Sequence, residues 1–233
     1  DDADFSYYHS WQSSLRQRLS RGLSFNAHYT WSKVMAVANG DFWLGNDIVV
    51  QDESNWRRDL GPTSLHVPHS FSFDAVYEIP SPIKLLQGFQ ISAIFTAASG
   101  SALNVTQSSN RGSSRPDYIA GDVYSNTGNR FQYLNRSAFA LVPIGPASGG
   151  TIRPGNVGKN AFLSPGRRNW DLSLAKAFRF RERYEFQIRA EAFNALNHVN
   201  LGAPIGDLAN ANFGRILNVG EARRLQLNAR FRF

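Results

Sequence analysis

The stretch ARRLQLNARFRF, residues 222–233, alternates apolar and polar side chains up to its last residue. Because successive side chains of a β-strand point to opposite faces, one face of this strand is apolar and the other polar. The apolar face carries Leu225, Leu227, Ala229, Phe231 and Phe233. A strand with lipid on one side and a water-filled lumen on the other needs this pattern. The stretch therefore predicts a strand of a transmembrane β-barrel.

Six further segments repeat the alternation, and each is longer than the ~5–6 residues typical of strands in soluble sheets. With the last one they predict about seven strands, over residues 9–19, 23–31, 70–79, 89–95, 170–180, 184–196 and 222–233. Their connections alternate short and long, with long loops at about 33–65, 105–168 and 198–221. Outer-membrane barrels have short periplasmic turns and long extracellular loops. We therefore predict an all-β fold, an antiparallel transmembrane β-barrel segment.

Aromatic side chains gather near both ends of the predicted strands. Those near the outer ends are Tyr8, Trp11, Tyr29, Trp31 and Trp170, and those near the inner ends are Phe180, Tyr184, Phe231 and Phe233. Two aromatic levels separated by smaller apolar residues are typical of the girdles at the two membrane interfaces. Aromatic residues also favour strands in general. A soluble all-β carbohydrate-binding module is therefore an alternative, in which the apolar faces would form a core.

Composition narrows the possible functions. The chain has 233 residues, no cysteine and a formal net charge of +7, with a pI near 10.0. Without cysteine it has no disulfide and no cysteine metal site, and no run of about 18 apolar residues could form a transmembrane helix. The basic residues recur at strand ends and form no single tract, so we expect no nucleic-acid partner. We expect no cofactor either.

The predicted strand number is odd. With the C-terminus on the periplasmic side, the first strand descends from outside and lacks an ascending partner. Seven strands would also leave two open edges, whose unpaired backbone groups find no water in lipid. We therefore expect residues 1–233 to form one domain, the C-terminal part of a larger barrel.

Several stretches, in order along the chain, are similar to segments of a known family. They are FNAHYTWSK at residues 25–33, RDLGP at 58–62, VPHSF at 67–71, NWDLSL at 169–174, RAEAFNALNH at 189–198, FGRI at 213–216 and the final strand. On these stretches the chain resembles TonB-dependent outer-membrane receptors of the Oar-like type, in which a carboxypeptidase-regulatory-like domain precedes the plug and the barrel. Ser70 departs from the pattern, since Arg is usual there, and residues 111–150 have no counterpart.

The resemblance implies a 22-stranded barrel that is filled by an N-terminal plug and takes up a ligand with energy from the TonB complex. It implies a non-enzymatic receptor of a Gram-negative type of outer membrane. The expected partners are membrane lipid, an unidentified extracellular ligand and the TonB complex, reached through a plug that has no counterpart in this sequence. The final strand is then the signal for the barrel-assembly machinery, carried by Leu225, Leu227, Ala229, Phe231 and Phe233. The alternative function is a cell-surface structural or interaction barrel that binds a partner through its loops without transport.

Two sets of side chains are candidates for function. Arginines near the periplasmic ends of strands are expected to face the lumen and contact the plug: Arg16, Arg18, Arg179, Arg230 and Arg232. The alternative is that they are part of an ordinary polar lumen wall. Aromatic residues of the long loops are expected to contact the ligand: Trp43, Trp56, Tyr118, Tyr124 and Tyr133. Such side chains on polar loops suit sugars, siderophores or peptides.

We expect no catalytic site and no metal site. His66 and His69 stand three residues apart near a strand entry, so their side chains point to opposite faces. The acidic residues of the 33–65 loop lack the spacing of a calcium-binding loop. Residues 155–160, GNVGKN, lack the first glycine and the final Ser or Thr of a phosphate-binding loop. Glu185 and Glu191 alternate with Arg189 and are better explained as paired charges of a wet wall than as an acid–base pair.

Overall fold

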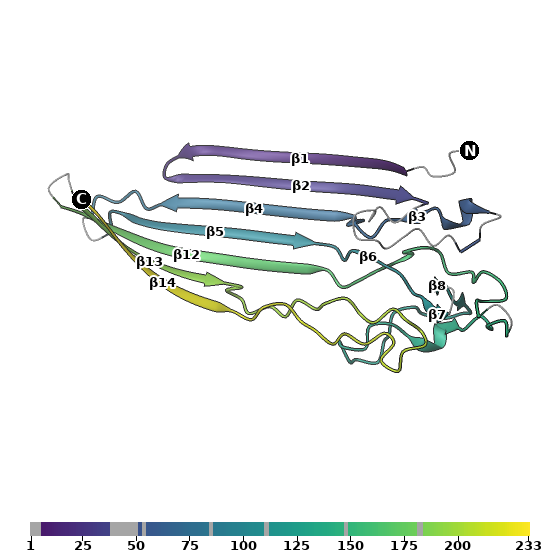
Figure 1. Cartoon of the computed structure of the whole chain (residues 1–233). Helices are drawn as coiled ribbons and strands as arrows, with labels where there is room; N and C mark the ends of the chain where they lie inside the picture. Colours follow the sequence, from purple (N-terminus) through teal and green to yellow (C-terminus); the bar gives the residue numbers. More distant parts are fainter. Residues whose placement is uncertain are drawn as a thin grey trace.

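A computed structural model of the chain describes residues 6–37, 51–52, 55–83, 86–109, 112–146, 149–180 and 184–233. Its main element is one antiparallel sheet in which the long strands follow each other in sequence order (Figure 1). These strands are β1 (Ser6–Ser20), β2 (Leu23–Ala36), β4 (His69–Glu78), β5 (Phe89–Ala98), β12 (Arg167–Phe180), β13 (Tyr184–Phe193) and β14 (Arg224–Arg232). The predicted all-β, antiparallel fold and its seven long strands are confirmed.

The loop lengths separate the two ends of the sheet. The short turns lie at one end, and the long connections gather at the other (Figure 1). We call these the turn end and the loop end. In the part of the chain that the structure describes, β1 pairs only with β2 and β14 pairs only with β13, so each has one open edge.

Strand register extends the apolar face of β14 across the sheet. Ala229 lies opposite Ile188 of β13, and Ile188 lies opposite Lys176 of β12. One residue along, Arg230 lies opposite Gln187, which in turn lies opposite Ala177. Residues directly opposite each other in an antiparallel pair share a face. The sheet therefore has one mainly apolar face and one mainly polar face, as the alternation predicts.

The first turn shows why glycine is needed at the turn end. Arg21 and Gly22 both have positive φ, 51° and 85°, as a two-residue hairpin turn that matches the twist of its strands requires. A Cβ on Gly22 would also lie 2.2 Å from the carbonyl oxygen of Glu78. This turn is the first of the short connections that the sequence predicts, and only glycine fits its second position without strain.

Several predicted strand limits were wrong by a few residues. β2 continues to Ala36, into the stretch predicted as a loop from residue 33, because its last residues pair with β1 and with the short strand β3 (Gly61–Pro62). β13 ends at Phe193 and not near residue 196, since Asn194 has a positive φ of 48°. A left-handed residue of this kind breaks the pleat, and asparagine tolerates it better than most residues.

The long connections are loops for most of their length, as predicted, but they also carry short elements and a small core that the sequence does not predict. We call their described parts, within residues 37–68, 99–166 and 194–223, the cap. A hydrophobic cluster of the cap consists of Leu103, Val105, Leu134, Ala138, Phe139, Val157, Leu208 and Phe213. The cap contains the short elements η2 (Trp56–Asp59), β6 (Ala102–Leu103), β7 (Gln107–Ser109), β8 (Gly112–Ser114), β9 (Asp117–Tyr118), η3 (Arg136–Ala138), β10 (Phe139–Ala140) and β11 (Phe162–Leu163). The cap is thus a folded unit with its own small core.

Candidate functional site

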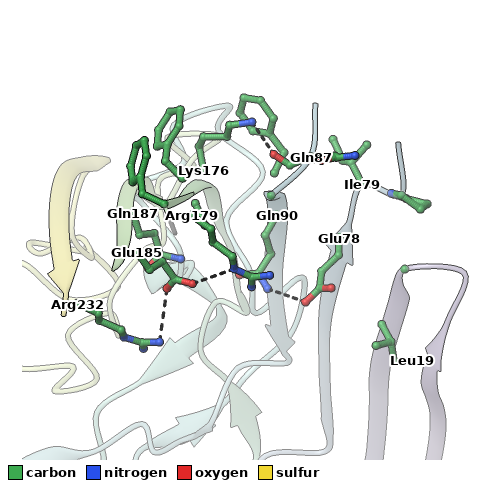
Figure 2. Close-up of a pocket in the computed structure, with 17 residues that line it drawn as sticks. Leu19, Glu78, Ile79, Gln87, Gln90, Lys176, Arg179, Glu185, Gln187 and Arg232 are labelled. Carbon is green, nitrogen blue, oxygen red and sulfur yellow. Dashed lines mark hydrogen bonds and ion pairs between the residues drawn. The ribbon is translucent and has the colours of Figure 1, made fainter. Parts of the chain in front are cut away.

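A charged cluster lies at the turn end on the polar face of the sheet. One carboxylate oxygen of Glu185 accepts a hydrogen bond from Arg179 (3.3 Å), and the other accepts one from Arg232 (3.5 Å) (Figure 2). These two bonds join β12, β13 and β14. Gln90 donates to Glu78 at 3.5 Å nearby. These residues line a cavity of about 900 Å³. The Arg179 side chain is 80% exposed, so each ion pair contributes at most ~1 kcal/mol.

The five predicted lumen arginines divide into two groups. Arg179, Arg230 and Arg232 lie on neighbouring strands, and two of them share Glu185. Arg16 and Arg18 lie on β1, at the opposite edge of the sheet. Within this described sheet, therefore, the structure does not bring all five together, and a role in contacting a plug stays a prediction for each of them.

Further polar side chains of this face are paired elsewhere in the sheet. Asn26 donates to Asp74 at 2.8 Å between β2 and β4, and Asn228 donates to Glu191 at 2.8 Å between β14 and β13. Glu191 also lies 3.7 Å from Arg189. This is the paired, wet wall that the sequence predicts for Glu185 and Glu191.

Lys176 was missed by the sequence reasoning because it interrupts an otherwise apolar face. Its ammonium donates to the carbonyl of Gln87 in the β4–β5 turn at 2.6 Å (Figure 2). It also lies 4.4 Å from the ring centroid of Phe89, within range of a cation–π contact. A long side chain can cover apolar surface while its charged end reaches the interface, so Lys176 is compatible with a lipid-facing position near the turn end.

A buried ion pair holds two of the connections that form the cap together. Arg115 and Asp59 form an ion pair with 2.5 Å between Nη1 and Oδ1, and their side chains are 8% and 2% exposed. Arg115 also donates to the carbonyl of Val157 at 2.8 Å, and the backbone N–H of Gln51 donates to Asp59 at 2.9 Å. The pair thus joins the first and second long connections.

A buried lysine makes a second attachment. The Lys159 ammonium donates to the carbonyls of Ala36 and Val37 at 2.6 and 2.7 Å, at the end of β2. The side chain of Asn160 donates to the carbonyl of Pro62 at 2.7 Å. Lys159 and Asn160 belong to the stretch that resembles a phosphate loop superficially, and here they anchor the cap.

The predicted ligand-contact aromatics have different surroundings. Tyr124 and Tyr133 meet edge to face at 5.2 Å, and both hydroxyls reach the carbonyl of Leu163. Because both hydroxyls bond to Leu163, these two side chains hold β11 in place. Burial raises the pKa of Tyr133 to about 12. Trp56 is partly exposed on η2, and Trp43 lies outside the described residues. Ligand contact stays a prediction for all five.

Tyr118 lines an open cleft where the first and second long connections meet, and we call it the cap cleft. Its cavity has a volume of about 640 Å³. The apolar lining consists of Tyr118, Ile119, Ala140 and Pro154, and the polar lining consists of Arg58, Asp117, Arg153 and Asn156. Sequence reasoning did not find Arg58, Asp117 or Arg153, because nothing in their spacing marks them as neighbours.

A two-pronged ion pair shapes the polar side of the cap cleft. Arg153 donates to both carboxylate oxygens of Asp117, at 3.0 and 2.6 Å. The hydrogen bond from Arg153 lowers the pKa of Asp117, and the same bond raises the pKa of Arg153. The backbone N–H of Asn156 adds a third bond to Asp117 at 3.0 Å. The pair is therefore ionised and fixed at neutral pH.

The two histidines at the entry to β4 have separate partners. His69 shares a hydrogen bond of 2.8 Å with the hydroxyl of Tyr29, whereas the ring of His66 accepts from the backbone N–H of Val34 at 3.3 Å. Burial and the nearby charge of Lys33 lower the pKa of His66.

Among the described residues there is no group of three His, Cys, Asp or Glu side chains that could hold a metal ion. The same residues include no helix that could cross a membrane.

Comparison with known proteins agrees with this architecture. Residues 1–226 match the model of the family described as outer membrane beta barrel domain. The crystal structure of the outer membrane transporter YddB from Escherichia coli is similar over 99% of this chain, with a TM-score of 0.52 and 13% sequence identity. This chain spans 26% of that transporter. No curated protein matches the sequence significantly. The chain belongs to the outer membrane beta-barrel domain family, and its place is the outer membrane.

Proposed function

We propose that the chain forms the C-terminal part of the barrel of a TonB-dependent receptor of the Oar-like type, which takes up an extracellular ligand and catalyses no reaction. The observation that carries this proposal is the sheet itself. It has long strands, one mainly apolar face, one charge-paired polar face and, among the described strands, two open edges. An open edge in lipid leaves backbone groups without partners, which favours closure by further strands into a wider barrel.

The cluster around Glu185 supports a plug in that lumen. Arg179 and Arg232 share the carboxylate of Glu185, so these three side chains carry one excess positive charge, and Glu78, bonded to Gln90, lines the same cavity. A plug that presents a carboxylate would complete the pairing and could release it at little cost, because exposed pairs contribute at most ~1 kcal/mol. The partners of the receptor would be membrane lipid, the barrel-assembly machinery, the TonB complex and the ligand.

The test is an immunoblot of native outer membranes with an antibody against residues 112–146, comparing heated and unheated samples. We expect a heat-modifiable band several times larger than 26.0 kDa, the mass of this chain. In the same membranes, the double change Arg179→Glu and Arg232→Glu should make the N-terminal plug more sensitive to trypsin, and Arg21→Glu in the first turn is the matched control. A membrane band at 26.0 kDa, or equal plug protection in all variants, would contradict the proposal.

The folded cap favours a second candidate function, a cell-surface interaction barrel without transport. Its buried cluster and anchors give it a defined surface that a partner could bind. Energy dependence separates the two functions. Accumulation of a bound ligand that stops when the proton gradient is dissipated favours transport, whereas cap-dependent binding without accumulation favours the second function.

A further inference from the structure

We propose that the cap cleft is a binding site for a neutral carbohydrate. The inference deepens the proposed function, on which it rests in one respect: the bound glycan would be the ligand that the receptor takes up. Binding itself needs only the cleft.

The cap cleft offers a rigid aromatic surface. Tyr118 is 41% exposed, and its ring packs edge to face on Phe139 of the cap core at 6.4 Å. Its hydroxyl donates a hydrogen bond to the carbonyl of Gly121 at 2.8 Å, so the hydroxyl proton already has a partner within the cap. What Tyr118 presents to a ligand is therefore chiefly its ring. Ile119 and Pro154 extend this apolar surface.

The backbone beside the ring is fixed as well. The side chain of Asn156 accepts from the N–H of Tyr118 at 2.6 Å and donates to its carbonyl at 3.1 Å. Both polar groups of the Tyr118 peptide are thus satisfied by one side chain. A ring held in this way loses little further freedom on binding, which favours affinity.

The polar side of the cap cleft suits vicinal hydroxyl groups. Arg153 and Asp117, joined by two hydrogen bonds of 3.0 and 2.6 Å, place N–H donors beside carboxylate acceptors. Adjacent hydroxyls of a sugar ring both donate and accept, so they can bond to such a pair without disturbing it. The apolar C–H face of the same sugar would lie on Tyr118.

Charge balance argues against an anionic ligand. Arg153 is neutralised by Asp117, and Arg58 lies 3.4 Å from Asp52. Each cation of the cleft has a carboxylate neighbour, so no strong positive potential is left to attract phosphate or carboxylate. A peptide ligand would need backbone partners, and the polar groups of the Tyr118 peptide are occupied by Asn156. A neutral, hydroxyl-rich ring fits best.

The experiment uses the intact protein in outer-membrane vesicles and measures fluorescence polarisation. The probes are fluorescein-labelled neutral oligosaccharides of hexoses and pentoses, uronic-acid oligosaccharides, and peptides of mixed sequence. We expect the neutral oligosaccharides to bind, with an affinity that high salt barely changes. Tyr118→Ala should weaken binding by about tenfold or more, because the stacking surface is lost. Tyr118→Phe keeps the ring and should bind like the parent.

Two further variants separate a binding defect from a folding defect. Phe131→Ala removes an exposed aromatic ring of the cap outside the cleft and should not change binding. Arg153→Gln should weaken binding about tenfold while the cap keeps its resistance to protease. The inference is wrong if uronic-acid probes or peptides bind more tightly than neutral glycans, if no neutral probe binds at millimolar concentration, or if Tyr118→Ala binds like Phe131→Ala.

The same vesicles and cells separate this inference from the proposed function. Glycan binding that depends on Tyr118 but never leads to energy-dependent accumulation would contradict the transport function and leave the carbohydrate site standing. Energy-dependent accumulation of a ligand by a protein that binds no neutral glycan would contradict the site and leave the transport function standing.

Discussion

Replacing Asp59 by Asn should loosen the cap by removing one charge from a buried ion pair. Asn keeps the acceptor for the N–H of Gln51, so the change isolates the missing charge. It leaves the guanidinium of Arg115, whose side chain is 8% exposed, without its anion. Breaking a buried pair from one side costs about 3–5 kcal/mol. At about 1.4 kcal/mol per factor of ten, the open form of the cap becomes roughly a hundredfold to several thousandfold more populated.

Hydrogen exchange on the intact protein measures this directly. The reporter is the amide of Val157, which bonds to the carbonyl of Pro116 next to Arg115. An amide of β13 reports on the wall and should not change. The double variant Asp59→Leu with Arg115→Met should lose less stability than Asp59→Asn alone, because no charge is left unpaired.

A surface pair provides the matched control. Arg58 and Asp52 lie 3.4 Å apart, and the Arg58 side chain is 43% exposed. Arg58→Gln should therefore change cap exchange by less than about 0.5 kcal/mol. If Asp59→Asn exchanges no faster than Arg58→Gln, the view that this buried pair holds two connections together is refuted.

Three further predictions follow from the same geometry. Because the folded-state pKa of His66 lies below its usual value, its contribution to stability is complete above about pH 6.5 and is lost as the pH falls through the lowered pKa. The protection factor of the Val34 amide, which donates to this ring, should fall as the pH drops below about 6.5, and His66→Gln should abolish that dependence. If the last strand is the assembly signal, Phe233→Ala and Phe231→Ala should reduce the heat-modifiable fraction of the protein in the outer membrane, whereas Arg232→Gln should not. Equal heat-modifiable fractions in all three variants would contradict the assembly-signal role. Gly22→Ala should cost about 1–3 kcal/mol, because it forces a Cβ to within 2.2 Å of Glu78 at a φ of 85°, and an unchanged unfolding midpoint in detergent would contradict the turn geometry.

The wall of the barrel could be predicted from the sequence because a strand has a local period. Alternation in β14 alone predicts that Leu227 lies on the apolar face of the sheet and Asn228 on the polar face. Pairing with β13 then places the residues opposite them on the same two faces. Limits of strands were less certain, since they depend on single residues such as Asn194 with its positive φ. The predicted faces were therefore correct where some predicted ends were not.

The cap could not be predicted in the same way. Asp59 and Arg115 are far apart in the chain, and neither lies in a periodic segment that would indicate burial. The cluster residues Val105, Leu134 and Phe213 are spread over both the second and third long connections. Their segments are rich in Gly, Ser, Asn and Pro, which are typical of exposed loops. Only long-range packing distinguishes this cap from such loops.

The candidate sites show the same division. The sequence predicts that Glu185 is one of the paired charges of the wall, but it does not predict that its partners are Arg179 and Arg232. The cap cleft requires Arg153 to meet Asp117 across an irregular segment, which no sequence motif encodes. Of the predicted ligand-contact residues, Tyr118 lies in this cleft, whereas Tyr124 and Tyr133 support β11.

The most direct test of the central claim is a cysteine scan of β14 in native outer membranes. The chain contains no cysteine, so each single substitution is the only thiol that this sequence contributes. A water-soluble maleimide should label Gln226→Cys, Asn228→Cys and Arg230→Cys, which lie on the polar face. Leu225→Cys, Leu227→Cys and Ala229→Cys should react only after detergent extraction, because lipid covers them. Labelling with a period of two is the result that the account predicts, and equal labelling of both sets would contradict it.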